Sequence, residues 1–339
     1  MRALVCTKSG EFAYEERERP SMKDGHAIIQ IKRIGICGTD LHAFEGTQPF
    51  FEYPRILGHE VAGDLVEFDN APGFHIGERV TFIPYFSCGT CIACRSGLPN
   101  CCSCIKVCGV HVNGGFVEYL SVPSASLVHS EGLNYDELSL VEPLAIGAHG
   151  VRRAGVKEGE FVLVVGAGPI GLGIAEFARI AGGRVIVMDI SQKRLQFCEH
   201  VLQVQHTINP LQTDAVEQLK NITGGDMPTV VIDATGNLKA INSAFSYMAH
   251  GARYVLVGLQ KAEISVSHPE FHKREATLMS SRNATREDFE QVIACLKKGL
   301  VKPTTFITHR VQFEEVKTHF KSWLKPEAGV IKATVELND

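Results

Sequence analysis

Three glycines between an apolar run and a helical stretch constrain the fold of this chain more than any other feature. The apolar run Phe161–Val165 leads into Gly166-Ala167-Gly168-Pro169-Ile170-Gly171, and a helical pattern continues to residue 181. In a strand–turn–helix unit, such glycines permit the tight turn, admit a pyrophosphate close to the backbone and bring the helix against the strand. The first helical turn then offers unpaired N–H groups to phosphate. Glycine-rich loops without a ligand share these letters, so the flanking strand and helix carry the prediction of a dinucleotide site.

The residue that ends the next apolar run bears on which dinucleotide is bound. This residue is Asp189, 18 positions beyond Gly171. A carboxylate here accepts hydrogen bonds from the adenosine ribose hydroxyls and repels a 2′-phosphate. Basic residues come only at Lys193 and Arg194, where the following helix begins. The pattern favours NAD over NADP, although Asp189 or Ser191 could serve only as a helix N-cap.

The rhythm of apolar runs changes along the 339 residues and predicts two domains. The first 140 or so residues alternate short β-type runs with turns, which is typical of an antiparallel, barrel-like domain. Farther along, continuous apolar runs alternate with helical stretches, as in a doubly wound parallel sheet covered on both faces. We expect the last 40 residues to return to the first domain. The predicted α/β fold therefore has a mainly β domain at 1–145 and 285–339 and a Rossmann domain at 146–284.

Cysteines are concentrated in one short segment. Seven of the eleven lie between Cys88 and Cys108, and four of these follow the spacing C-x2-C-x2-C-x7-C. Four thiolates on one loop can enclose a tetrahedral zinc and close its shell against water, which stabilises a loop that has little core of its own. We assign a structural zinc to Cys88, Cys91, Cys94 and Cys102, with Cys101 as the alternative to the last of these.

Composition excludes several classes of partner. Lys and Arg number 34 against 38 acidic residues, for a net charge of −4, so no overall basic field attracts nucleic acid or an anionic membrane. The longest apolar stretch contains Glu176 and Arg179 among its glycines and does not read as a membrane span. An odd number of cysteines and no export signal indicate a reducing compartment. We expect a cytoplasmic protein that acts on a small molecule.

A second metal site is indicated by residues that would mean little singly. Cys37 lies in Gly35-Ile36-Cys37-Gly38-Thr39-Asp40-Leu41-His42, and Gly58-His59-Glu60 follows 21 residues after Cys37. A lone buried Cys or a lone His-Glu pair is usually structural. Thiolate, imidazole and carboxylate together, in a chain that also shows a dinucleotide turn, favour a catalytic zinc that keeps an open position.

These motifs, in this order, resemble the zinc-containing medium-chain dehydrogenase/reductase family over essentially the whole chain. Glu142, in Val141-Glu142-Pro143-Leu144, stands where the animal alcohol dehydrogenases carry a zinc-binding Cys, so the resemblance is to the polyol, threonine and sugar-acid branch. It implies that the first domain is a GroES-like catalytic domain. It also implies oxidation of a secondary alcohol of an L-galactonate-like sugar acid or a polyol to a ketone, with hydride transfer to NAD.

The resemblance also implies roles for single residues. The catalytic zinc would be held by Cys37 and His59, with Glu60 and Glu142 as direct or water-bridged partners, and Asp40 would orient His59. A proton would leave through Thr39, the cofactor ribose and His42. Cofactor contacts are expected at Arg194, Thr235, Val257, Gly258 and Ser281, with a phosphate contact from Lys332. Substrate contacts are expected from Phe50, Phe51, His111 and Arg282. The family further suggests a homodimer or homotetramer.

Two other interpretations compete with this one. A zinc-free quinone or enone reductase would keep the glycine turn but would not need Cys37, His59 or the cysteine segment. A non-catalytic NAD-binding redox sensor would not need a proton route through Thr39 and His42. Turnover and metal content separate the three.

Overall fold

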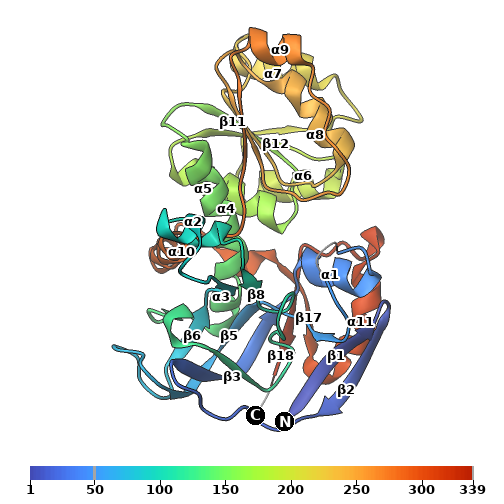
Figure 1. Ribbon diagram of the computed structural model, residues 1–339. Helices are drawn as coiled ribbons and strands as arrows, with labels where there is room; N and C mark the ends of the chain where they lie inside the picture. The colour runs from blue at the N-terminus through green and yellow to red at the C-terminus, as the bar shows by residue number, and fades with distance from the viewer. Residues whose placement is uncertain (49–50, 338–339) are drawn as a thin grey trace. The chain divides into compact units, whose positions relative to one another are not determined.

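The chain divides into two units in a computed structural model that describes residues 1–48 and 51–337 (Figure 1). Unit 1 comprises Met1–Pro143 and Thr285–Asp339, and unit 2 comprises Leu144–Ala284. The division points lie within two residues of the expected boundaries at 145 and 285. Unit 1 is therefore discontinuous in sequence.

Unit 2 is built on a parallel sheet of six strands in the order β13-β12-β11-β14-β15-β16. Chain order reverses at β11, and in such sheets ligands bind beyond the carboxyl ends of the strands at this switch point. The strands are β11 (Phe161–Val165), β12 (Arg184–Met188), β13 (His206–Ile208), β14 (Val230–Asp233), β15 (Arg253–Leu256) and β16 (Thr277–Ser280). The helices are α4 (Val141–Ala154), which begins in unit 1, α5 (Pro169–Ile180), α6 (Gln192–His200), α7 (Ala215–Thr223), α8 (Leu238–Ala244) and α9 (His268–Lys273).

Unit 2 confirms the predicted doubly wound sheet. Its central strands are buried on both faces, with Leu163, Val231 and Tyr254 fully inaccessible to solvent. Continuous apolar runs without alternation arise because helices cover both faces of a parallel sheet. The apolar runs in this half of the sequence, at 161–165, 185–188, 230–233 and 253–257, form β11, β12, β14 and β15.

Unit 1 is mainly antiparallel, as predicted. Its largest sheet has seven strands, ordered β10-β6-β5-β3-β18-β17 with β9 also paired to β3, beside a sheet β2-β1-β4 and a pair β7-β8. The strands are β1 (Arg2–Lys8), β2 (Glu11–Glu16), β3 (His26–Gly35), β4 (Arg55–Ile56), β5 (Glu60–Phe68), β6 (Arg79–Phe82), β7 (Tyr85–Phe86), β8 (Lys106–Val107), β9 (Tyr119–Pro123), β10 (Leu127–His129), β17 (Ile307–Gln312) and β18 (Lys332–Glu336). The helices are α1 (Gly38–Glu45), α2 (Ile92–Arg95), α3 (Tyr135–Ser139), α10 (Arg286–Lys297) and α11 (Val316–Trp323).

The carboxyl-terminal segment completes the core of unit 1. Strand β18 pairs antiparallel with β3 and parallel with β17, so two strands from the end of the chain extend a sheet begun by its first third. Phe320 of α11 packs its ring against Phe12, with centroids 4.9 Å apart, and against Phe44 at 5.2 Å. Aromatic pairs at these separations add to the stabilisation from buried area.

A network of ion pairs joins α3 to β3, β17 and β18. The carboxylate of Asp136 accepts hydrogen bonds from Arg33 on β3, at 2.8 Å, and from Arg310 on β17, at 2.6 Å. Both guanidinium groups also lie near Glu336 on β18, at 3.4 and 3.1 Å. Burial would raise the pKa of Asp136, but the hydrogen bonds from Arg310 and Arg33 prevail and lower it. Residues from both ends of the chain are thus held by one cluster of charges.

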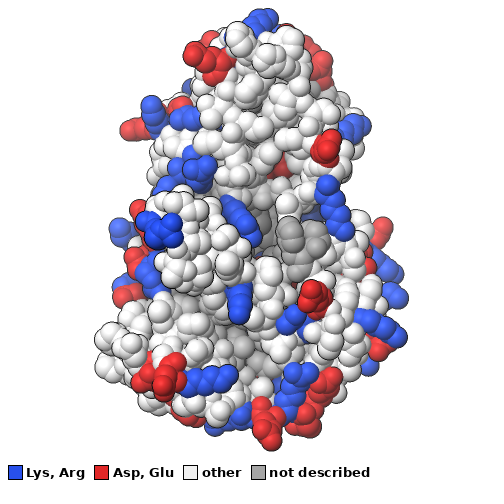
Figure 2. All heavy atoms as spheres, viewed as in Figure 1, with Lys and Arg blue, Asp and Glu red and all other residues white. Residues whose placement is uncertain are grey.

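Basic and acidic side chains are mixed over the visible face (Figure 2). Within residues 1–48 and 51–337, no helix combines the length and the apolar character needed to cross a bilayer.

Candidate metal and cofactor sites

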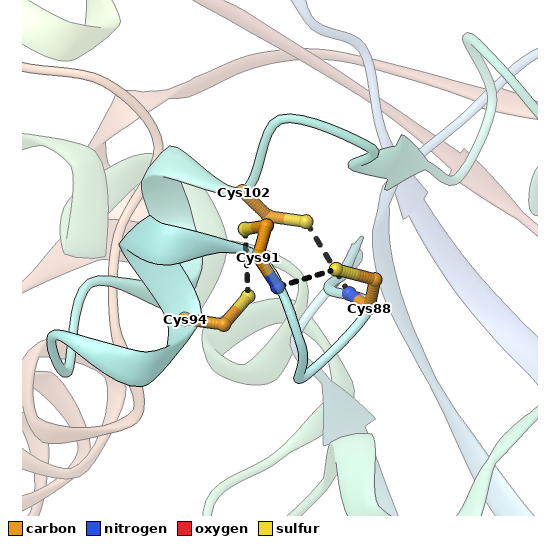
Figure 3. Close-up of side chains that lie close together, drawn as sticks. All are labelled: Cys88, Cys91, Cys94 and Cys102. Carbon is orange, nitrogen blue, oxygen red and sulfur yellow. Dashed lines mark hydrogen bonds between the residues drawn. The ribbon is translucent and has the colours of Figure 1, made fainter.

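The four cysteines assigned to a structural zinc come together in one segment of unit 1, residues 88–102, which we call the cysteine lobe. The sulfurs of Cys88, Cys91, Cys94 and Cys102 all lie within 4.8 Å of one another (Figure 3). Those of Cys91 and Cys94 are 3.5 Å apart, close to the separation of about 3.8 Å between sulfurs bound tetrahedrally to zinc at about 2.3 Å. Cys101 is exposed and is not part of this group, whereas Cys102 is buried. The donor set therefore fits zinc.

Backbone N–H groups of the lobe point at these sulfurs. Cys91 N donates to Cys88 Sγ at 3.4 Å, and Cys88 N and Cys104 N donate to Cys102 Sγ at 3.3 and 3.4 Å. N–H groups of Cys94 and Ser103 lower the pKa of the Cys91 thiol to about 5. Since the thiolate is the form that binds a metal, these N–H groups favour the metal-binding form of Cys91. The lobe also gives Cys104, which had no predicted role, a contact through its backbone.

A second group of metal-binding side chains consists of Cys37, His59 and Glu60, whose ligand atoms also lie within 4.8 Å of one another. Cys37 is the N-cap of α1, just after β3, and Glu60 begins β5. The antiparallel register of β3 and β5 places Gly35 opposite Glu60. A Cβ at Gly35 would lie only 2.1 Å from Glu60 Oε2, so glycine there makes room for the carboxylate.

Asp40 ties together the two segments that carry these ligands. Its carboxylate is buried and accepts hydrogen bonds from Cys37 N at 2.9 Å and from Gly58 N at 3.0 Å. Asp40 Oδ1 lies 3.8 Å from His59 Nδ1, which is too long for a hydrogen bond. Among the described residues, no side chain or backbone group hydrogen-bonds to this buried nitrogen. Asp40 supports the loop that carries His59, and its orienting role remains a prediction.

The electrostatics of this group favour an additional positive charge. Burial would lower the pKa of His59, but the negative charges of Cys37 and Asp40 raise it well above the ordinary value. A buried site that would hold a proton on imidazole against the cost of burial also suits a divalent cation. Thiolate, imidazole and carboxylate are donors that zinc accepts.

Lys332 was predicted to contact a cofactor phosphate, and the structure places it in an ion pair that the sequence did not reveal. It is 2% exposed, and its Nζ lies 2.7 Å from both carboxylate oxygens of Glu60 and 3.1 Å from the Ile36 carbonyl. Burial would lower its pKa, but the negative charges of Glu60 and Cys37 raise it. The ammonium therefore neutralises Glu60 at the metal pocket, and a phosphate contact stays a prediction.

Glu142, the other carboxylate expected at the zinc, lies outside the group of three ligands. It is buried and accepts a hydrogen bond from the hydroxyl of Tyr85, 57 residues away in sequence. Burial and the charge of Glu60 raise the pKa of Glu142 to about 7, although the charge of His59 and the Tyr85 hydroxyl lower it. His59 feels the charge of Glu142. Glu142 thus lies near enough to His59 for its charge to act on the imidazole, and it contacts Tyr85. We call Cys37, His59, Glu60 and Glu142 together the catalytic pocket.

In unit 2, the three glycines of the turn after β11 meet three different requirements. Gly166 has φ +100°, which a side chain rarely adopts, and a Cβ at Gly171 would lie 1.8 Å from the Gly166 carbonyl oxygen. A Cβ at Gly168 would meet nothing closer than Arg194 Nη1 at 4.0 Å. Gly168 is the N-cap of α5, and Pro169 and Ile170 open the helix. The turn therefore needs glycine for its shape at two positions and leaves open space at the third, as a pyrophosphate would require.

Asp189 supports this turn from the end of β12. Its Oδ2 accepts from Ala167 N at 2.6 Å, and its Oδ1 accepts from Ser191 N at 2.7 Å. Ser191 caps α6 by accepting from Arg194 N at 3.4 Å. The capping alternative thus applies to Ser191. Each carboxylate oxygen of Asp189 keeps further acceptor capacity for a ribose hydroxyl.

The other predicted cofactor residues follow the neighbouring strands β14 and β15. Thr235 donates its hydroxyl to Asp233 Oδ2 at 2.8 Å, and Val257 N and Gly258 N donate to Asp233 O at 2.9 and 3.0 Å. Ser281 follows β16, and its buried hydroxyl has no hydrogen-bond partner among the described residues. These segments lie at the carboxyl edge of the sheet, where ligands bind in this class of fold.

The predicted proton route and substrate contacts are less closely defined. Thr39 is half-buried in α1, and His42 is 63% exposed, with Nδ1 3.2 Å from Thr47 Oγ1. Phe51 stacks edge-on against Tyr53, with ring centroids 4.8 Å apart, in the margin of the core. His111 is exposed and accepts from Val107 N at 3.1 Å. Arg282 is also exposed. Phe50 lies outside the described residues.

A parallel sheet with a dinucleotide turn and a discontinuous β unit with two zinc-type donor sets define a metal-dependent dehydrogenase. The chain belongs to the zinc-binding dehydrogenases: this family model matches residues 169–298, and the alcohol dehydrogenase GroES-like domain matches residues 23–132. The predicted family, the GroES-like domain and the enzymatic class are thereby confirmed. The assignment counts against the zinc-free reductase and the non-catalytic sensor.

Known relatives cover nearly the whole chain. It is 46% identical to L-galactonate-5-dehydrogenase of Escherichia coli strain K12 over 92% of each chain, and 32% identical to sorbitol dehydrogenase of Halalkalibacterium halodurans over 93% and 94%. Among solved structures, RspB of E. coli CFT073, described as an alcohol dehydrogenase complexed with NADH, superimposes with a TM-score of 0.92 at 32% identity over 99% of each chain.

Proposed function

We propose that this chain oxidises a secondary alcohol of an L-galactonate-like sugar acid, or of a polyol, to a ketone with NAD as hydride acceptor. The observation that carries the proposal is the group of half-buried Cys37 with buried His59 and Glu60, in a fold that also presents a dinucleotide turn. The two relatives reported above, named for a sugar acid and a polyol, support the substrate class.

Each part of the site has a proposed task. When bound, zinc supplies a Lewis acid that makes the substrate hydroxyl more acidic, and NAD supplies the hydride acceptor. Cys37 and His59 would hold the ion, with Glu60 and Glu142 as direct or water-bridged partners. Thr39 accepts the hydroxyl proton and His42 passes it to solvent.

The choice of NAD rests on Asp189. Its carboxylate is 8% exposed and accepts two backbone N–H groups, which hold it in place at the end of β12. A fixed negative charge here repels the 2′-phosphate of NADP. We infer that the glycine turn and the segments after β14, β15 and β16 bind the rest of the dinucleotide.

We further propose a cytoplasmic homodimer or homotetramer. All eleven cysteines are free, including seven within 21 residues, which suits a reducing compartment. Sedimentation of the purified protein tests the assembly, and a monomer at micromolar concentration would contradict it.

A substrate panel tests the function. L-Galactonate, L-idonate, L-gulonate, sorbitol, L-threonine and short primary alcohols are offered with NAD or NADP, and the reduced cofactor is followed by its absorbance. We expect turnover of a polyhydroxy compound with NAD. Loss of that turnover in Cys37→Ser, with full activity in Cys101→Ser as the matched control, would tie it to the proposed site. Faster oxidation of short primary alcohols than of every polyhydroxy compound would overturn the proposal.

A further inference from the structure

Tyr85 is a buried residue outside every predicted site, and it connects the cysteine lobe to the catalytic pocket. It is 9% exposed, it lies on β7, and it precedes the first lobe ligand, Cys88, by three residues. Its hydroxyl donates a hydrogen bond to the carboxylate of Glu142. The side chain of Tyr85 thus extends from the strand that precedes the cysteine lobe to the carboxylate of Glu142 in the catalytic pocket.

The lobe determines where the backbone of Tyr85 lies. Strand β7 pairs antiparallel with β8, with Tyr85 opposite Val107, and all four lobe ligands lie between these two strands. Cys88 N donates to Cys102 Sγ at 3.3 Å, and Cys108 N donates to Pro84 O at 2.9 Å. An ion bound by Cys88 and Cys102 would therefore clamp the two strands at the end nearest the lobe.

The ring and the hydroxyl of Tyr85 are held separately. The ring packs edge-on against Phe289 of α10, with centroids 6.5 Å apart, while the hydroxyl is directed to Glu142. The two carboxylates of the pocket thus differ in their partners. Glu60 faces the ammonium of Lys332, which cancels its charge, whereas a phenol orients Glu142 without cancelling its charge. The phenol sets no positive charge beside Glu142, and its hydrogen bond fixes the direction of the carboxylate.

We infer that Tyr85 is a positioning residue for Glu142 and that the cysteine lobe supports the catalytic metal site through it. The inference rests on the proposed function for its kinetic consequence, because Glu142 acts there on the bound metal and its ligands. Its structural consequence can be measured without turnover.

The test uses Tyr85→Phe, which removes the hydroxyl and keeps the ring against Phe289. The matched control is Tyr135→Phe, which removes a hydroxyl that donates at 2.7 Å to Asp64, a carboxylate outside the metal group. With Co²⁺ in the catalytic site and Zn²⁺ in the lobe, we expect the visible spectrum of the cobalt to change in Tyr85→Phe and not in Tyr135→Phe. We expect kcat to fall about 10- to 100-fold in Tyr85→Phe, with KM for NAD and two metals per chain unchanged.

Two further variants make the result decisive. Glu142→Gln should change the cobalt spectrum by itself, and adding Tyr85→Phe to it should cause little further change, since both act through one hydrogen bond. Cys88→Ser, which opens the lobe, should shift the spectrum in the same direction as Tyr85→Phe. A Tyr85→Phe spectrum identical to that of the wild type, or additive changes in the double variant, would overturn the inference. Absence of turnover on every substrate would overturn only the proposed function, because the cobalt spectra would still report on the pocket.

Discussion

The contact between α5 and the glycine turn predicts a large effect of one added methyl group. In Gly171→Ala, the new Cβ would lie 1.8 Å from the Gly166 carbonyl oxygen, whereas carbon–oxygen contacts are ordinarily about 3.3 Å or longer. The helix must then move away from the turn by roughly 1.5 Å, and neither partner is a side chain that can rotate. Overpacking a rigid core costs about 1–3 kcal/mol, and backbone contacts fall at the upper end. For unit 2, about 3 kcal/mol corresponds to a fall of roughly 10 °C in Tm.

Gly168→Ala is the matched control, since its Cβ would meet only Arg194 Nη1 at 4.0 Å. Calorimetry of both variants measures their Tm, and titration of NAD followed by protein fluorescence measures their affinity for NAD. Together the two measurements separate a loss of stability from a loss of binding. We expect Gly168→Ala to keep the wild-type Tm within about 2 °C and to bind NAD at least tenfold more weakly, because the methyl group occupies the space for the pyrophosphate. A Gly171→Ala protein as stable as the wild type, or equal losses of stability in both variants, would refute this reasoning.

Three other perturbations test the charges and the lobe. Lys332→Met should lower the free energy of unfolding by about 3–5 kcal/mol in urea titrations, because it leaves Glu60 buried without a counter-charge. Adding Glu60→Gln should restore most of the lost stability, and a double variant without this recovery would contradict the pairing. Asp136→Asn should lower the free energy of unfolding by about 2 kcal/mol at pH 7. Because the folded-state pKa of Asp136 is lowered, the carboxylate contributes its full stability above its ordinary pKa of about 4 and loses it as pH falls through the folded-state pKa. The difference in stability between variant and wild type should therefore vanish in acid, and a difference independent of pH would count against the network. Cys102→Ser should lose one zinc per chain by metal analysis while Cys101→Ser loses none, and the reverse result would show that the fourth ligand is misassigned.

The sequence predicted those sites whose residues lie close together along the chain. The cysteine spacing and the glycine turn each lie within 15 residues, so the chain has little freedom in how it brings them together. The alternation of apolar runs and helical stretches predicted the parallel sheet of unit 2, because burial on both faces removes polar positions from the strands.

Contacts between distant segments were beyond such reasoning. Tyr85 and Glu142 are 57 residues apart, and Lys332 and Glu60 are 272 apart. No local pattern marks either pair, since a Tyr on a short strand and a Lys on a terminal strand have many ordinary uses. The role of Lys332 was accordingly predicted from family likeness alone, and its ion pair emerged only from the register of β18 beside β3.

The position of β18 between β3 and β17 has a consequence for biosynthesis. Residues 36–331, which are 296 residues, lie between the end of β3 and the start of β18, and a ribosome adding about 5–20 residues per second needs roughly 15–60 s to make them. For that time the last residues of β3 lack their neighbour on one side in the nascent chain, and Glu60 lacks its ammonium. The cysteine lobe, complete by residue 102, can take up its ion while translation continues. The group of Cys37, His59 and Glu60 gains the ammonium of Lys332 only once β18 has been made, so until then the charge of Glu60 has no counter-charge from this strand.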